Sequence, residues 1–333
     1  MRRLSMAGVF IAAIAIPFSG ALAALAVSSA ASADDYPART ITLVVPYPSG
    51  GGVDVMARVV AEKLSARIGQ QVVVDNRAGG AALVGTRSFL KSAPDGYTLF
   101  LGHTGSLAIN PSLFGNAGFD PRRDFAPIGL IAAMPVAIVA NPSFPAKTVG
   151  ELLTLAKTQP RSLTIGTAPV GTGSYLSAEL FKAVTEIDAV IVPYKGTGHV
   201  INDVVGNHVP VAFGVLPPAL GNLQAGTLRA IAVLSPERFS LLPDIPTAGE
   251  SGLPGFEAVL HYGLLAPAGT PRGIVVRLNT VLRSLVDSSE VRRRIHAEGG
   301  EPLTSTPEEY GRDIDSEETK WGRLVRKLNL KMD

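Results

Sequence analysis

Two glycine-rich loops carry the residue types best suited to chemistry in this sequence. Residues 46–54 and residues 166–174 each contain three glycines, and each stands between a predicted strand and a predicted helix. Glycine lets the backbone approach a ligand closely, and the free N–H groups and dipole at a helix start favour a bound anion. Thr172 and Ser174 add hydroxyl donors to the second loop. The two loops therefore predict a carboxylate site, because no lysine follows the first loop in the spacing used for nucleotide phosphates.

Simpler interpretations of the same residues stay open. A plain turn between a strand and a helix would need only one glycine, and Ser174 is also suited to be a helix N-cap. Asp54, in the first turn of the first predicted helix, is interpreted as a partner of the helix dipole and of Arg58 four residues later. On that interpretation Asp54 does not touch the ligand.

Catalytic, metal and cofactor chemistry is not predicted. The chain has no cysteine, its five histidines lack paired metal-ligand spacing, and no serine-hydrolase, zinc-protease or P-loop motif is present. His103, directly after a predicted strand, is the histidine of most interest, and its role stays open. Lys195 lies in a later loop, where it is suited either to pair with a second carboxylate or to remain a solvated lysine.

Alternating strand and helix patterns predict how these loops are positioned. Strands over residues 41–45, 71–74 and 97–101 alternate with helices over residues 53–68 and 82–93. This order predicts a parallel α/β sheet. After a long apolar run, residues 128–141, the alternation begins again, so two lobes of similar build are expected. Three amphipathic helices are predicted at the end of the chain, over residues 271–286, 289–297 and 307–328.

The N-terminus predicts export. Arg2 and Arg3 precede an uncharged apolar stretch, which ends in the small residues Ala31, Ser32 and Ala33. This is the layout of a signal peptide over residues 1–33, cleaved near Ala33, although an uncleaved membrane anchor is the alternative. The remaining 300 residues hold 28 basic and 28 acidic side chains. A neutral mature chain does not predict binding to nucleic acid.

Several short stretches resemble one known family, the substrate-binding proteins of tripartite tricarboxylate transporters, also called the Bordetella uptake gene (Bug) family. The similar stretches are residues 36–39, 45–54, 75–80, 94–99, 192–196, 242–247, 250–255, 266–271, 306–310 and 320–321. The resemblance implies a type II periplasmic-binding-protein fold of class α/β, with two lobes, a hinge and an interlobe cleft. It implies lobe 1 over residues 34–130 and 256–333, and lobe 2 over residues 131–255.

The same resemblance implies a ligand-binding set and partners. The predicted ligand-binding residues, gathered from both lobes, are Tyr47, Ser49, Gly50, Gly51, Thr104, Thr172, Gly173, Ser174, Tyr194 and Phe213. The implied ligand is a small dicarboxylate, tricarboxylate or aromatic acid. The implied protein partners are the small and large membrane subunits of the transporter, or a sensor kinase.

One departure from the family bears on the ligand. Family members often carry two aspartates in the stretch that corresponds to residues 209–214, and this chain has neither. If the second aspartate meets an ammonium or hydroxyl group, an amino-acid ligand is less expected here. Two other functions stay open: an exported enzyme acting on a carboxylated substrate, and a carboxylate-binding protein dedicated to a sensor.

Overall fold

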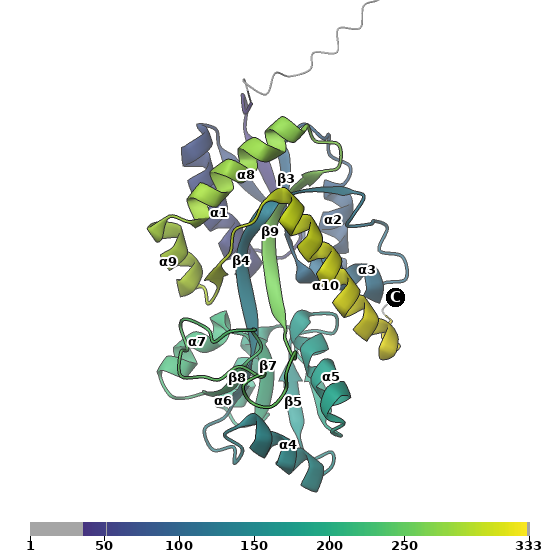
Figure 1. The fold of residues 1–333 in the computed structure, drawn as a ribbon, viewed down its shortest axis with the longest axis vertical. Helices are drawn as coiled ribbons and strands as arrows, with labels where there is room; N and C mark the ends of the chain where they lie inside the picture. Colours follow the sequence, from purple (N-terminus) through teal and green to yellow (C-terminus); the bar gives the residue numbers. More distant parts are fainter. Residues whose placement is uncertain (1–35, 51, 332–333) are drawn as a thin grey trace, which may run out of the picture.

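The computed structural model describes residues 36–50 and 52–331. The predicted signal peptide, residues 1–33, and the predicted site residue Gly51 lie outside the described residues. Two bodies of mixed helix and strand, here called lobe 1 and lobe 2, lie at opposite ends of two long strands, β4 (Phe125–Ala140) and β9 (Val259–Pro267) (Figure 1). Both strands cross from one lobe to the other, so the lobes are joined by extended backbone.

Lobe 1 is the upper body in Figure 1. It begins and ends the described chain, and helices cover both faces of its sheet, as an α/β architecture requires. Its elements are β1 (Ile41–Val45), α1 (Gly52–Ile68), β2 (Val72–Asn76), the short η1 (Gly80–Ala82), α2 (Leu83–Phe89), β3 (Thr98–His103), η2 (Gly105–Ile109), α3 (Asn110–Leu113), α8 (Arg272–Val286), α9 (Ser289–Ala297), β10 (Glu301–Pro302) and α10 (Pro307–Lys327).

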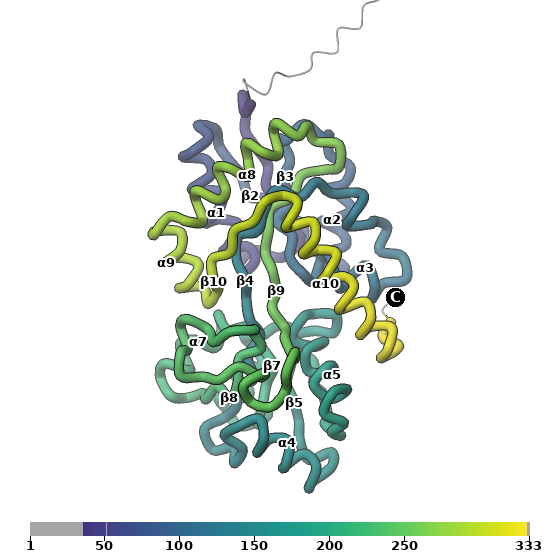
Figure 2. Tube along the Cα trace, viewed as in Figure 1, coloured from purple at the N-terminus to yellow at the C-terminus, as the bar shows by residue number. Residues whose placement is uncertain are grey.

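Lobe 2 is the lower body, built from the middle of the chain (Figure 2). Its elements are α4 (Val149–Thr158), β5 (Thr164–Thr167), α5 (Gly173–Thr185), β6 (Val190–Pro193), α6 (Thr197–Val205), β7 (Val211–Val215), α7 (Pro217–Gln224) and β8 (Arg229–Val233). The predicted lobe boundaries stay predictions; the boundary between residues 130 and 131 falls inside β4, and that between 255 and 256 falls just before β9.

The ten strands of the described residues form one sheet, in the order β2-β1-β3-β9-β4-β7-β5-β6, with β8 and β10 paired to β4. In lobe 1, β1 pairs in parallel with β2 and β3, and in lobe 2, β5 pairs in parallel with β6 and β7. The predicted parallel pairing is therefore present in both lobes, but the sheet as a whole is mixed, because β4 and β9 pair antiparallel with each other and with their other neighbours. Since carboxyl ends of neighbouring parallel strands meet at one sheet edge, the loops that follow them gather there.

Strand β4 changes its neighbours at the level of Pro135. Up to Pro135 it pairs with β9, and from Val136 onward it pairs with β7 and then also with β8. Proline has no N–H to donate to a neighbouring strand and is normally confined to such irregular places. The apolar run at residues 128–141 thus lies almost entirely in one strand. The first part of this strand pairs with β9, and the second part pairs with β7 and β8.

Helix α10 packs against β4, η2, α3 and α5, and it crosses the front of the view in Figure 1. It starts with the capping box formed by Thr306 and Glu309, in which each side chain accepts a backbone N–H from the other residue. Its fully buried Trp321 donates to Glu317 at 2.7 Å. Among residues 36–50 and 52–331, none of the helices combines the length and the apolar character needed to cross a membrane.

Candidate functional site

A cavity of about 440 Å³ lies between the lobes, at the edge where the strand ends meet. Residues of lobe 1, residues of lobe 2 and the crossing strand β9 together form its wall. The lobe 1 residues that line it are Tyr47, Pro48, Gly52, Val53, Ala81, His103, Gly105 and Asn110. The lobe 2 residues are 168–174, Lys195, Gly196, Thr197 and Val215, and β9 contributes Leu260 and Tyr262.

Three helices begin at this cavity. The first residues of α1, α5 and α6, which are Gly52, Gly173 and Thr197, all line it. The first four N–H groups of an α-helix have no partner within the helix, and the helix dipole places partial positive charge at that end. The cavity thus collects three favourable sites for negative charge, one from lobe 1 and two from lobe 2.

Asp54 holds the first glycine-rich loop in shape. Its buried carboxylate accepts hydrogen bonds from the Gly50 N–H at 2.9 Å, from Arg58 Nε at 2.9 Å and from Asn76 Nδ2 at 3.0 Å. Burial would raise the pKa of this carboxyl group, but the hydrogen bonds outweigh burial and the pKa is lowered. The pairing with Arg58 confirms the partner that the sequence predicted for Asp54, and the bond from Gly50 adds a role in holding the loop.

An aromatic wall closes the cavity on the side of the crossing strands. The Tyr47 and His103 rings are stacked with centroids 4.8 Å apart, and Tyr262 tilts against His103 at 5.3 Å. Burial lowers the pKa of His103 to about 4 and raises the pKa of Tyr262 to about 12. The imidazole is therefore neutral at pH 7. Because its Nδ1 accepts the Gly105 N–H at 2.7 Å, its proton resides on Nε2.

Stability is expected to fall with acidification because of His103. Its pKa is lower in the folded chain than the ordinary 6.5 of an unfolded chain, so below about pH 6.5 the unfolded state binds the proton more readily. Between pH 7.5 and pH 5 this one group should reduce the free energy of unfolding by on the order of 2 kcal/mol. Urea titrations of the wild-type protein and His103→Gln at both pH values measure it. An equal pH dependence in both proteins would contradict the assignment.

The second glycine-rich loop presents one free hydroxyl, while the hydroxyls of Thr167 and Thr172 are already hydrogen-bonded. Thr172 is the N-cap of α5: its Oγ1 accepts the Tyr175 N–H and donates to the Pro169 carbonyl. The alternative that Ser174 is the cap is therefore wrong. Ser174 is buried, and its hydroxyl has no hydrogen-bond partner among the described residues. Ser174 is thus the hydroxyl of this loop that remains able to donate to a ligand.

Strained and irregular backbone surrounds the lobe 1 wall. Ala81 and Ala82 both adopt positive φ angles, 51° and 78°, which cost an L-residue free energy. The buried Asn110 side chain donates to the Ala81 carbonyl and so supports this conformation. Next to His103, η2 is a π-helix, a form that is rare and frequent at functional sites. These features carry no periodic sequence signal, so neither Ala81 nor Asn110 was among the predicted site residues.

The structure brings four of the predicted ligand-binding residues to the cavity wall: Tyr47, Thr172, Gly173 and Ser174. Ser49 and Gly50 lie on the same loop as Tyr47 but do not line the cavity. Three further predicted residues lie elsewhere. The Thr104 hydroxyl accepts the His261 N–H behind the wall, the Tyr194 hydroxyl donates to Asp203 at 2.7 Å, and the fully buried Phe213 packs on Phe181 in the lobe 2 core.

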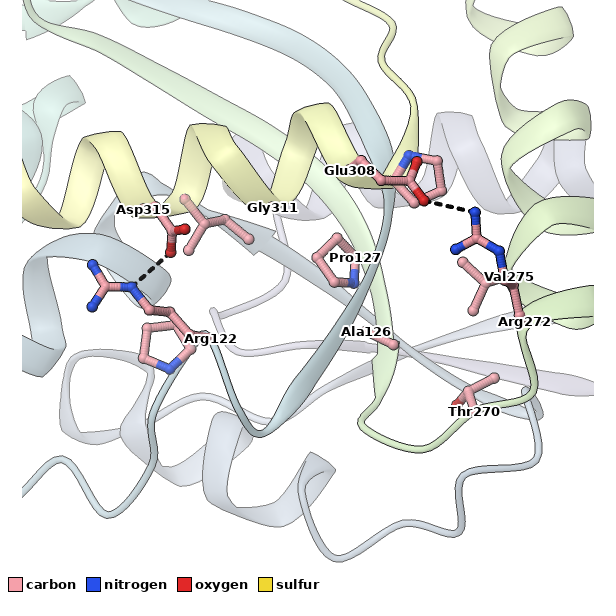
Figure 3. Close-up of a pocket in the computed structure, with 12 residues that line it drawn as sticks. Arg122, Ala126, Pro127, Thr270, Arg272, Val275, Glu308, Gly311 and Asp315 are labelled. Atoms are coloured by element: carbon pink, nitrogen blue, oxygen red, sulfur yellow. Dashed lines mark hydrogen bonds and ion pairs between the residues drawn. The ribbon is translucent and has the colours of Figure 1, made fainter.

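A second hollow lies on the outer face of lobe 1, between α8, α10 and the start of β4 (Figure 3). Its charged residues form ion pairs with one another: Arg122 with Asp315 at 2.6 Å, and Arg272 with Glu308 at 2.8 Å. Each charge at this surface is thus already compensated by the protein. The interlobe cavity differs, because none of its described lining residues is acidic while Lys195 lines it.

Two lobes joined by two crossing strands, with a cavity between them, define a hinged solute-binding protein. The family model described as the tripartite tricarboxylate transporter family receptor matches residues 56–330. Protein BugT of Bordetella pertussis strain Tohama I is 34% identical over 332 residues, which cover 99% of this chain and 98% of BugT. This chain therefore belongs to the tripartite tricarboxylate transporter receptor family, as the sequence resemblance predicted.

Solved structures with bound acids are similar to this one. Rpa4515 of R. palustris with adipate is 34% identical, with a TM-score of 0.81, and the match covers 90% of this chain and all of that chain. MatC of Rhodopseudomonas palustris with bound malate is 32% identical, with a TM-score of 0.76, and the match covers 87% of this chain and all of that chain. The likeness to these structures and to the periplasmic binding protein BugD, which is 32% identical with a TM-score of 0.77, confirms the predicted type II periplasmic-binding-protein fold.

Proposed function

We propose that this protein captures a small carboxylate between its lobes, without transforming it, and delivers it to the small and large membrane subunits of a tripartite tricarboxylate-type transporter. The observation that carries the proposal is the charge character of the cavity. Three helix N-termini, a lysine and an unpartnered serine hydroxyl face a space whose described lining holds no acidic side chain. Such an environment favours an anion over a neutral or cationic solute.

The relatives support a carboxylate in particular. The family is named for receptors of tricarboxylate transporters, and two similar structures contain the dicarboxylates adipate and malate. The remainder of the wall is apolar, from Val53, Val215 and Leu260 to the aromatic rings. A cavity of about 440 Å³ is within the usual range for small-molecule sites, which is roughly 300–1,000 Å³. It therefore suits an acid with a short carbon skeleton.

The arrangement of polar groups supports binding over catalysis. His103 uses Nδ1 to accept the Gly105 N–H, and in the described residues its ring forms no hydrogen bond with Ser174 or Thr172. A serine nucleophile is ordinarily activated by a base in hydrogen-bond reach.

We further propose that residues 1–33 direct export and are removed near Ala33. The mature protein would then work in the periplasm, where it can reach its membrane partners.

The proposal is tested on the full chain expressed in a Gram-negative host. The protein should be recovered from the periplasmic fraction with Asp34 as its first residue. A thermal-shift screen of malate, adipate, citrate and benzoate should then show stabilisation by at least one acid. A ligand at a hundredfold excess over its Kd stabilises by about 2.7 kcal/mol. Mass spectrometry of each acid after incubation should show no new product, and turnover of an acid would favour the enzyme alternative.

A further inference from the structure

His103 is a buried histidine whose two ring nitrogens have different surroundings. The residue ends β3, lines the interlobe cavity and is only 9% exposed. Its Nδ1 accepts the Gly105 N–H, so the ring proton is on Nε2. The Nε2–H group has no hydrogen-bond partner within residues 36–50 and 52–331. Since buried polar groups in proteins are nearly always hydrogen-bonded, this donor is a group that a bound molecule can satisfy.

The Nε2 atom also remains accessible. It is not one of the completely enclosed side-chain atoms that lack a partner in the described part of the chain, so it keeps contact with open space. The open space that the His103 ring lines is the interlobe cavity. A donor that is buried by protein on its other sides is therefore open on the side of the proposed ligand.

The imidazole ring is held in one orientation. It stacks on Tyr47 with an interplanar angle of 17°, and Tyr262 tilts against it at 40°. Gly105 lies against the ring edge, where a Cβ atom would stand 2.4 Å from His103 Cε1. Because its neighbours already fix the ring, a ligand would not have to order this donor on binding.

The bond to Gly105 does not by itself require a histidine. An acceptor that takes the N–H two residues later is the arrangement of an Asx turn, which asparagine and aspartate side chains form with their short side chains. Asparagine at position 103 would therefore satisfy the Gly105 N–H. Histidine adds a second nitrogen farther from the backbone, and this nitrogen has no role in the described contacts of the protein.

His103 is an uncharged donor at neutral pH, because burial lowers its pKa to about 4. A neutral imidazole with its proton on Nε2 can only donate from that atom, so its partner must be an acceptor such as a carboxylate oxygen. The other unpartnered hydroxyl donor on the wall is that of Ser174, at the start of α5. The two donors belong to different lobes, so an acid that accepts from both would link them.

We propose that His103 is a ligand-contacting residue, which donates its Nε2–H to an oxygen of the bound carboxylate from the lobe 1 side of the cavity. The inference rests on the proposed function and deepens it, because it assigns to that site a residue that sets affinity. His103 is not one of the ligand-binding residues that the family resemblance implied. Its role follows from its burial, its fixed ring and its free nitrogen.

The test compares two substitutions that each keep one half of the hydrogen bonding of His103. His103→Asn keeps an acceptor for the Gly105 N–H but has no donor at the Nε2 position. It should weaken acid binding by about 10- to 50-fold, as expected for a lost hydrogen bond to a charged group. His103→Gln keeps an amide donor near the Nε2 position and should bind within about fivefold of the wild-type protein.

Calorimetry measures these affinities with adipate, malate, citrate and benzoate, and the variants are compared for each acid that the wild-type protein binds. His208→Asn is the control, because the His208 side chain is 74% exposed on lobe 2 and does not line the cavity. This variant should bind each acid as the wild-type protein does. Circular dichroism of each variant confirms that the fold is retained.

A second readout follows the ring itself. In isotope-labelled protein, the Nε2–H resonance of His103 is assigned by its loss in His103→Gln. This resonance should move to lower field when the protein is saturated with the acid, because the donor gains a charged acceptor. A histidine that only holds the Gly105 turn would show the larger change on the Nδ1 side of the ring.

The outcomes separate the two proposals. A smaller loss of affinity in His103→Asn than in His103→Gln would assign the histidine to the turn alone, and would leave carboxylate capture intact. An unchanged Nε2–H resonance in protein saturated with acid would also overturn the ligand contact. Failure of the wild-type protein to bind any of the four acids would count against both proposals.

Discussion

Gly173→Val is expected to weaken carboxylate binding by about 100-fold or more. A Cβ atom at Gly173, the first residue of α5, would stand 2.3 Å from Leu260 Cδ2 on β9, far inside contact distance. Leu260 itself lines the cavity, so a shift of its side chain changes the shape of the cavity wall. The added methyl groups of valine also stand at the start of α5, where a ligand would approach the free N–H groups, and the expected 100-fold loss of affinity corresponds to about 2.8 kcal/mol of binding free energy. Calorimetry with adipate measures the change.

A matched control lies in the same lobe. Gly150 is in the first turn of α4, as Gly173 is in α5, but a Cβ there would meet only Thr148 Oγ1, at 3.9 Å. Gly150→Val should therefore bind adipate as the wild-type protein does. If Gly173→Val retained affinity within about threefold of wild type while remaining folded, the start of α5 would not be part of the ligand site.

Asp54→Ala is expected to lower the free energy of unfolding by about 2–4 kcal/mol, and to weaken ligand binding as well. The substitution leaves the Gly50 N–H, the Asn76 amide and the Arg58 guanidinium without their shared acceptor. Hydrogen bonds to a charged group contribute about 1.5–3 kcal/mol, and unsatisfied donors add a further cost. The loop that carries Tyr47 would keep the bond from Asn76 to the Tyr47 carbonyl but lose the tie from the Gly50 N–H to Asp54. Urea unfolding and calorimetry measure the two effects.

Asp188→Ala is the control for removing a paired aspartate. The carboxylate of Asp188 lies 3.5 Å from Arg161, and both side chains are mostly exposed. Exposed ion pairs contribute about 0–1 kcal/mol, so this variant should lose little stability. Since the pKa of Asp54 is lowered, its stabilising effect should also disappear as the pH falls through that lowered pKa. A loss in Asp54→Ala no larger than in Asp188→Ala would contradict the supporting role.

The sequence was sufficient to predict the parts of the site that depend on local backbone chemistry. Dense glycine between a strand and a helix predicted both loops, and the amphipathic pattern over residues 307–328 predicted helix α10. Helix α7 and the π-helix after His103 were not predicted, because α7 is short and begins with two consecutive prolines, and a π-helix has no distinctive residue pattern. Sequence patterns thus predicted the structure correctly where the conformation of a segment depends mainly on its own residues.

The remaining wall residues could not be predicted because their position depends on segments far apart in the chain. Tyr262 and Leu260 reach the cavity through the pairing of β9 with β3 and β4, about 160 residues from β3 by sequence. Tyr194 and Phe213 were predicted from their place in family-like stretches, but one is held by Asp203 and the other is buried in the core. Which face of a strand points to the cavity is decided by packing that a single sequence does not display.

The exchange of strand partners at Pro135 bears on how the two lobes can move. Proline has no N–H, so β4 donates one hydrogen bond fewer at the level where its neighbours change from β9 to β7 and β8. A small rotation there should meet little elastic resistance from the sheet. The resting angle between the lobes would then be soft, and the enclosed solute, more than the backbone, would set the shape that a membrane partner meets.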